Sequence, residues 1–300
     1  MKLLQYPADC HKKNWESIQR MCVLYDIILE QTNDRERLNI KDYDILWLPM
    51  FWLSPDEVPN CKIMMGPHHF TFPDKRKGDI CGSPNPEWSS RSFYSCLSPW
   101  VRDLYHEFTE ETTIPLCCIP FGIKELPARN LSNCIYDCIL YTKHRDTSEI
   151  EYIEKILVKK GVEYVKFSYG SYKDNEYQDA LQKAKFVIWL GSHESQGFAF
   201  QECLARNIPI LVCDAIDLYK ESFHYYEEHR GQKALRSTTA SWWDSRCGLK
   251  IDTLDSFPSA LHKMKHSYNS FTPQAFVREN LSDKVCMERI LQTLGFVTNI

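Results

Sequence analysis

Two glutamates with a glycine between them are the residues of this 300-residue sequence whose types and spacing best suit chemistry. Glu194 and Glu202 flank Gly197 in a segment that follows the strongly apolar run at 186–190. Glycine lets the backbone approach a ligand closely, and N–H groups at the start of a helix attract anions, so amides near Gly197 and Phe198 can face an anionic group. The arrangement suits an elongated ligand held by a carboxylate at each end. The alternative is a surface loop with one helix-capping glutamate and one solvated glutamate.

An alternation of strands and helices must position these residues. In the second half of the chain, apolar runs predict strands at 134–141, 163–167, 186–190 and 208–213, and the segments between them predict helices at 148–161, 174–185 and 197–206. Strands separated by helices in this way form βαβ units and a parallel sheet. Because ligands bind at the carboxyl ends of the strands in open parallel sheets, we expect the site in the strand-to-helix turns.

The first half of the chain shows the same alternation. Apolar runs predict strands at 2–6, 44–51, 62–65, 93–97 and 116–120, with helices at 15–29 and 99–108 and a loop at 73–90. A turn-rich passage at 121–130 separates the two halves, and the tail at 258–294 is mostly helical in pattern. We therefore predict two α/β domains, at 1–127 and 128–271.

Composition and charge exclude several classes of protein. Hydrophobic residues make up 43% and charged residues 25%, close to the globular average, which rules out disorder and coiled coil. The net charge of -4 indicates no broad basic surface for nucleic acid. The thirteen cysteines are scattered without a Cys-x2-Cys pair, which predicts reduced thiols in a cytoplasmic protein. The apolar stretch at the N-terminus is too short for a signal peptide, and no run reaches the length of a membrane span.

The segment around the two glutamates is similar to a known signature. Glu194-x7-Glu202 with Gly197-Phe198, followed by Cys203-Leu-Ala-Arg-Asn-Ile-Pro-Ile-Leu-Val, resembles that of retaining GT-B glycosyltransferases of the family 4-like group. The stretch Ser192-His-Glu-Ser-Gln-Gly-Phe-Ala also resembles a subgroup of large DNA viruses and some bacteria. The resemblance implies a GT-B fold, in which two Rossmann-like domains with parallel sheets face an interdomain cleft. It also implies that a C-terminal helix, at about 272–294, packs back on the first domain.

An activity follows from the same resemblance. Members of this group move a sugar from a nucleoside diphosphate sugar to a hydroxyl of a glycan or another acceptor, with retention of configuration and without a metal. No cofactor is therefore expected, and we recognise no Asp-x-Asp or other clustered carboxylate metal site. A nucleotide-dependent dehydrogenase would need Gly-x-Gly-x-x-Gly after a strand, which the sequence lacks. A non-catalytic GT-B-like module that binds a nucleotide-sugar or a glycan stays open as the alternative.

Carried over by position, the resemblance assigns donor contacts to single residues. It implies that Glu202 contacts the ribose of the donor and that Glu194 contacts hydroxyls of the transferred sugar. It further implies that backbone amides near Gly197 and Phe198 meet the sugar and the phosphate. His193 lies in the same loop and belongs to the expected donor-binding set.

Two basic residues and two residues of a later turn complete the expected donor site. The resemblance assigns the diphosphate to Lys143 and Arg145, which follow the first strand of the second domain. Their spacing is narrower than is usual in the group, so which of them takes which role stays open, and a solvated loop is the alternative. Ser171 and Tyr172 lie where relatives bind the base, although Tyr172 equally suits a core aromatic.

The first domain is expected to supply the acceptor side. His68 and His69 follow a buried strand, and the resemblance makes them candidates for a histidine near the reacting sugar. His11, in the loop after the first strand, is a weaker acceptor-side candidate. For each of these histidines, packing under a loop is the structural alternative.

Overall fold

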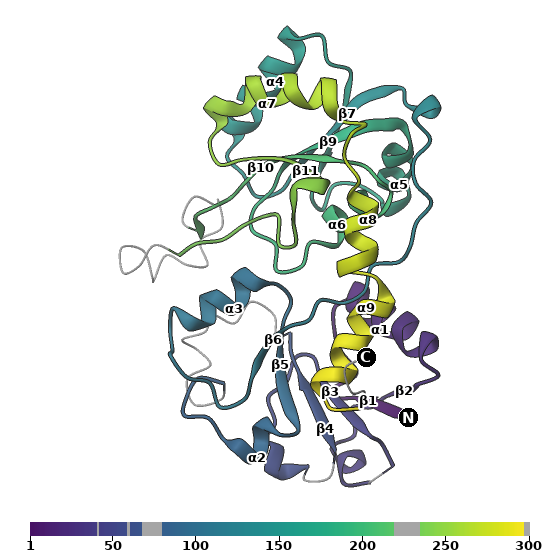
Figure 1. Ribbon diagram of the computed structural model, residues 1–300, viewed down its shortest axis with the longest axis vertical. Helices are drawn as coiled ribbons and strands as arrows, with labels where there is room; N and C mark the ends of the chain where they lie inside the picture. Colours follow the sequence, from purple (N-terminus) through teal and green to yellow (C-terminus); the bar gives the residue numbers. More distant parts are fainter. Residues whose placement is uncertain (41, 59–60, 68–79, 219–234, 297–300) are drawn as a thin grey trace. The chain divides into compact units, whose positions relative to one another are not determined.

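The chain forms two compact α/β units in a computed structural model that describes residues 1–40, 42–58, 61–67, 80–218 and 235–296. The first unit comprises Met1–Gly122 together with Leu281–Ile300, and the second comprises Ile123–Asn280 (Figure 1). The first segment of the first unit thus ends at Gly122, whereas the sequence pattern predicts a domain boundary after residue 127. Each unit is built around one parallel sheet.

The sheet of the second unit has a reversal in its strand order. Its strands are β7 (Tyr136–Thr142), β8 (Tyr164–Ser168), β9 (Ala184–Leu190), β10 (Ile210–Cys213) and β11 (Gly248–Ile251), in the order β11-β10-β9-β7-β8. All neighbours are parallel. The apolar pattern predicts four of these strands and misses β11, which is short and has Lys250 in its middle. Because β8 lies on one side of β7 and β9 on the other, the order reverses between β7 and β9, where such sheets bind ligands.

Helices cover both faces of this sheet. They are α4 (Thr147–Lys159), α5 (Asp174–Lys183), α6 (Phe198–Ala205), α7 (Phe257–Ser267) and α8 (Pro273–Asn280). Helices α4 and α7 share a hydrophobic core with one face of the sheet (Figure 1). On the other face, Tyr141 of β7 and Trp189 of β9 stack with ring centroids 3.9 Å apart, and Phe200 of α6 packs against Trp189. The strands are therefore buried on both sides, as their continuous apolar runs predict.

The first unit repeats this architecture. Its strands are β1 (Lys2–Gln5), β2 (Ile28–Gln31), β3 (Ile45–Leu48), β4 (Lys62–Met65), β5 (Ser92–Cys96) and β6 (Leu116–Cys118), in the parallel order β2-β1-β3-β4-β5-β6. Its helices are α1 (Lys12–Leu24), α2 (Pro86–Ser89), α3 (Pro99–His106) and α9 (Asp283–Thr293). Helix α2 lies inside the segment predicted as a loop. No helix in the described part of the chain combines the length and the apolarity needed to cross a membrane.

The edge strand β2 corrects the prediction of a helix at 15–29. Helix α1 ends at Leu24, and Asp26 has a positive φ of 51°, which breaks the helix before Leu29. Leu29 continues the helical spacing of apolar residues by coincidence, but it pairs with Leu3 of β1. As an edge strand with exposed ends, β2 lacks the continuous apolar run that marks the buried strands.

The C-terminal tail forms two helices where the sequence suggests a single one at about 272–294. Helix α8 belongs to the second unit and packs against α6, whereas α9 belongs to the first unit and packs against α1. The guanidinium of Arg20 on α1 donates from Nε and Nη2 to the carboxylate of Asp283 at 2.9 and 3.0 Å. This bidentate pair and the apolar contacts of α9 tie the end of the chain to the first unit.

Gly248 is expected to be indispensable for the docking of β11. Its φ is 137°, and a Cβ added there would lie 2.2 Å from the carbonyl oxygen of Ile210. We predict that Gly248→Ala lowers the free energy of unfolding by about 3 kcal/mol, because backbone strain and overpacking add. Gly170→Ala is the control: φ is 77°, but no described atom lies within 4 Å of the added Cβ, so the loss is about 1 kcal/mol. Urea unfolding measures both, and equal losses would contradict the packing argument.

Candidate functional site

An ion pair joins the two strand ends at which the order of the second sheet reverses. Lys143 follows β7, and Glu194 lies in the loop after β9, with Lys143 Nζ 2.8 Å from Glu194 Oε1. The side chains are 16% and 15% exposed, so the pair is largely buried but still reaches water. The loop after β9 is anchored to the same residue, because the N–H of Ser192 donates to the carbonyl of Lys143 at 2.8 Å. The sequence places both residues at strand ends, and the structure brings them together.

Tyr169 is a wall of this site that the sequence analysis missed. It follows β8 directly, and Lys143 Nζ lies 4.6 Å from the centroid of its ring. The ring of His144 meets it edge-on at 5.5 Å, and Tyr169 is 53% exposed. An ammonium over an aromatic face is held by the quadrupole of the ring. Its position two residues after the predicted strand at 163–167 is the signal that could have marked Tyr169 as a candidate.

Gly197 brings the first turn of α6 against Glu194. It is the N-cap residue in the left-handed conformation, with φ 79°. A Cβ at this position would lie 3.2 Å from Cβ of Glu194 and 3.3 Å from its Cγ, closer than ordinary contact. Glycine also has no side chain that could cap the N–H groups of the first turn, which begins at Phe198. The start of α6 therefore adjoins the carboxylate-bearing loop, as the sequence predicts, and its dipole favours an anion there.

Glu202 is oriented by an amide from the neighbouring helix. Gln178 of α5 donates from Nε2 to Glu202 Oε2 at 2.7 Å. The orientation of that amide is set in turn by Arg206, whose Nε and Nη2 donate to Gln178 Oε1 at 3.1 and 2.9 Å. The carboxylate of Glu202, on the second turn of α6, is therefore held in one orientation.

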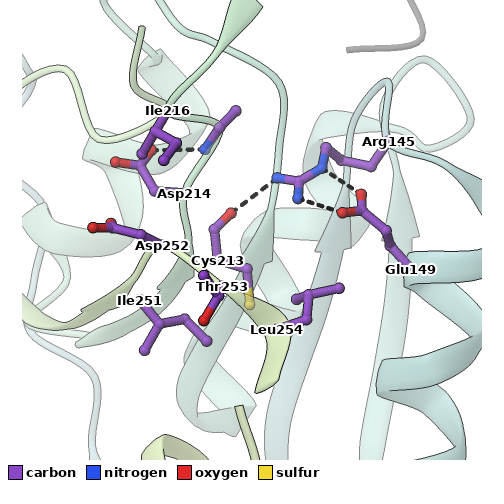
Figure 2. A pocket seen from close by; sticks show the side chains of 10 residues that line it. Arg145, Glu149, Cys213, Asp214, Ile216, Ile251, Asp252, Thr253 and Leu254 are labelled. Carbon is purple, nitrogen blue, oxygen red and sulfur yellow. Dashed lines mark hydrogen bonds and ion pairs between the residues drawn. The ribbon is translucent and has the colours of Figure 1, made fainter. Parts of the chain in front are cut away.

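Arg145 contacts a different carboxylate and two backbone carbonyls, and Figure 2 shows its bonds to Glu149 and Cys213. Its side chain is 9% exposed, and Nε and Nη2 donate to the two oxygens of Glu149 at 2.7 and 3.0 Å. Nη1 donates to the carbonyl oxygens of Gly191 and Cys213 at 3.1 and 3.0 Å. The guanidinium thus joins the carboxyl ends of β9 and β10 to the first turn of α4. It forms one wall of a pocket of about 250 Å³ that also reaches Asp252 and Thr253.

Ser171 and Tyr172, in the turn after β8, have different surroundings. Ser171 is exposed, and its N–H donates to the carbonyl of Ser168 at 3.0 Å. Tyr172 packs edge-on against Phe167 and shares a hydroxyl–hydroxyl hydrogen bond of 3.1 Å with Tyr141. Burial raises the pKa of Tyr172, so its phenol stays protonated at neutral pH. These contacts fit the alternative that Tyr172 is a core aromatic residue.

Of the remaining predicted site residues, two histidines can be placed. His193 is buried, with 7% exposure, in the loop between β9 and α6. His11 is exposed at the N-cap position of α1, where its carbonyl accepts hydrogen bonds from the N–H groups of Asn14 and Trp15. His68 and His69 lie outside the described residues.

One Asp-x-Asp sequence does occur in the chain, at Asp42 and Asp44, although the sequence analysis recognises none. Lys2 occupies both carboxylates: its Nζ donates to Asp42 at 2.8 Å and its backbone N–H to Asp44 at 2.8 Å. These groups lie at the amino ends of β1 and β3, away from the carboxyl ends at which such sheets bind ligands. Within the described ranges, no three His, Cys, Asp or Glu side chains gather as a metal site.

Comparison with known proteins identifies the architecture. No family model matches the chain, and no curated protein matches it in sequence. Among solved structures, the lipopolysaccharide outer core galactosyltransferase WaaB matches 98% of this chain and 99% of its own at 9% identity, with a TM-score of 0.56. Sucrose-phosphate synthase from Thermosynechococcus elongatus matches 97% of each chain at 10% identity, with a TM-score of 0.55. The chain has the GT-B fold.

Larger GT-B proteins are similar to it as well. TarM matches 84% of this chain at 11% identity with a TM-score of 0.51, and the match spans 54% of TarM. At these identities the likeness concerns the fold alone. The reversal between β7 and β9 is the kind of position at which open parallel α/β sheets bind ligands.

Proposed function

We propose that this protein is a glycosyltransferase that moves a sugar from a nucleoside diphosphate sugar to a hydroxyl of a glycan or another acceptor. We further propose that it retains the anomeric configuration and uses no metal, as the resemblance of its Glu194-x7-Glu202 segment implies. The observation that carries the proposal is the contact between Lys143 and Glu194 at the strand-order reversal. It is supported by the GT-B fold and by the start of α6, which adjoins the side chain of Glu194.

In this proposal Lys143 and the first turn of α6 receive the diphosphate. Cleavage of the bond between the sugar and the diphosphate develops negative charge on the leaving group. An ammonium and helix-terminal amides fixed in advance stabilise that charge without reorganising during the reaction. The diphosphate replaces Glu194 as the partner of Lys143, which frees the carboxylate to accept hydrogen bonds from hydroxyls of the transferred sugar.

The other end of the donor is assigned to Glu202. Ribose presents two adjacent hydroxyls, and a carboxylate already oriented by Gln178 can accept from both. Ser171 and Tyr172 are proposed to meet the base, and His193 is proposed to contribute to the donor site. On the acceptor side, His68, His69 and His11 stay as candidates from the sequence.

Donor binding is tested by thermal unfolding with UDP-, GDP- and ADP-sugars. A donor at a hundred times its dissociation constant stabilises the folded state by about 2.7 kcal/mol, and one of the three bases is expected to give most of this shift. We predict that Glu202→Gln removes most of the shift, because the ribose hydroxyls lose a charged acceptor. Glu163→Gln, an exposed change at the amino end of β8, is the matched control. If Glu202→Gln and the parent respond alike, Glu202 does not bind the nucleotide.

Release of the nucleoside diphosphate separates a transferase from a binding module. A transferase hydrolyses its donor slowly without acceptor and faster with one, whereas a module that only binds gives a thermal shift and no release. Retention is read from the anomeric configuration of the product by NMR, and metal independence from a rate that a chelator leaves unchanged.

A further inference from the structure

Residues 237–241, called the strap, are joined by hydrogen bonds to the loop that carries Glu194. The carbonyl of Thr238 accepts the N–H of Glu194 at 3.1 Å, and the hydroxyl of Ser241 donates to the carbonyl of Gln196. The hydroxyl of Thr239 accepts from the indole N–H of Trp189 at 2.9 Å, which ties the strap to β9. The backbone position of Glu194 therefore depends on where the strap lies.

Asp214, the first residue after β10, fixes the strap. Its carboxylate accepts from the hydroxyl of Thr238, at 2.9 Å on Oδ1 and 2.8 Å on Oδ2, and from the N–H of Thr239 at 2.8 Å. The N–H of Ala215 donates to it at 2.9 Å, and Lys250 Nζ lies 3.2 Å from Oδ2. The side chain is 1% exposed, so water cannot replace these partners. The buried carboxylate of Asp214 thus accepts hydrogen bonds from two residues of the strap, Thr238 and Thr239.

This chain of contacts has a direct consequence for the proposed reaction. The carboxylate of Asp214 accepts from the hydroxyl of Thr238, and the carbonyl of Thr238 accepts from the backbone N–H of Glu194, so Thr238 links the Asp214 carboxylate to the backbone of Glu194. We infer that Asp214 is a positioning residue that holds Glu194 in register with the donor sugar. The inference rests on the proposed function, because it assigns Glu194 a substrate to be aligned with. Misplacement of a reacting group by about 1 Å lowers a rate by about 100-fold.

The kinetic test is a double-mutant cycle of Asp214→Asn and Glu194→Gln. Asp214→Asn is expected to lower kcat for donor cleavage by about 100-fold, with a smaller change in the KM of the donor. The double variant is expected to be no slower than Glu194→Gln alone, because alignment matters only while the carboxylate of Glu194 is present. Effects that multiply in the double variant would overturn the inference.

Asp137→Asn serves as the matched control for the cycle. Asp137 is also a carboxylate in a lysine pair, with Lys185 at 2.7 Å, but it lies at the amino end of the same sheet. Its substitution is expected to leave kcat unchanged and to show no coupling to Glu194→Gln. Coupling of the same size in both cycles would mean that any loss of stability slows the reaction, which would overturn a specific role for Asp214.

Hydrogen exchange tests the same link without any reaction. The amide of Glu194 is expected to exchange slowly in the parent and in Asp137→Asn, and at least 10-fold faster in Asp214→Asn. Thr238→Val, which removes the hydroxyl and keeps the carbonyl, should accelerate it less, and it replaces Asp214→Asn if that variant does not fold. Unchanged exchange in the folded variants overturns the inference. A parent that cleaves no donor, but whose Glu194 exchange depends on Asp214, overturns the proposed function and supports the holding role.

Discussion

Replacement of Lys143 by alanine is expected to lower the rate of donor cleavage by a factor of about 10²–10³ while the protein stays folded. Removal of one preorganised group that stabilises charge in a transition state has an effect of this size. Lys143 Nζ lies 2.8 Å from Glu194, whose side chain adjoins Gly197 at the start of α6, so its loss takes the cation from the point at which the diphosphate is proposed to leave. The rate is measured as release of nucleoside diphosphate at saturating donor.

The same variant is expected to be less stable than the parent by about 1–3 kcal/mol but to stay folded. Both side chains of the Lys143–Glu194 pair are largely buried, so the loss of Lys143 removes this partner from the carboxylate of Glu194, which is only partly hydrated. Lys166→Ala is the control. Lys166 lies on the outer strand β8 and also pairs with a glutamate, Glu154 of α4, at 3.1 Å. The control should change neither rate nor stability. A Lys143→Ala protein that cleaves donor at the parental rate would remove the observation on which the proposed function rests.

Much of the fold could be predicted because its strands are buried on both faces. Strands such as β4 and β9 read as unbroken apolar runs with clear ends. The two missed strands have a physical reason in common, since β2 and β11 are edge strands with half-exposed or charged positions. Local sequence also placed Glu194 in the loop after a buried strand and Glu202 inside the helix that follows, because Gly197 marks the turn.

The partners within the site could not be predicted in the same way. Lys143 and Glu194 are 51 positions apart, and they meet because β9 pairs with β7, which no local pattern encodes. Asp214 and the strap are joined across 24 positions by hydrogen bonds from a segment without periodicity. From the sequence, Lys143 and Arg145 are two basic residues whose roles cannot be told apart. Only their surroundings show that one lies against Glu194 and the other against Glu149 and two carbonyls.

Arg145→Ala is therefore expected to act on stability before it acts on the donor. The change would leave the carboxylate of Glu149 and the carbonyls of Gly191 and Cys213 without the guanidinium that joins them. Figure 2 shows the bonds to Glu149 and Cys213. Removal of one partner of a buried ion pair costs about 3 kcal/mol of unfolding free energy. Arg145→Lys should recover little, because an ammonium cannot span a carboxylate and two carbonyls at once. Urea unfolding measures both variants.

Arg278→Ala provides the matched comparison for Arg145→Ala. Arg278 pairs with Glu125 at 2.7 Å, but the two side chains are 58% and 69% exposed, so its loss should cost less than about 1 kcal/mol. Donor-induced thermal shifts then separate the two basic residues of the site. If Arg145→Ala is as stable as Arg278→Ala and yet loses the donor shift, the guanidinium holds phosphate. If Arg145→Ala is destabilised but the folded variant keeps the donor-induced thermal shift, Lys143 binds the diphosphate. Arg145 then has a structural role, because it joins the ends of β9 and β10 near the Lys143–Glu194 pair.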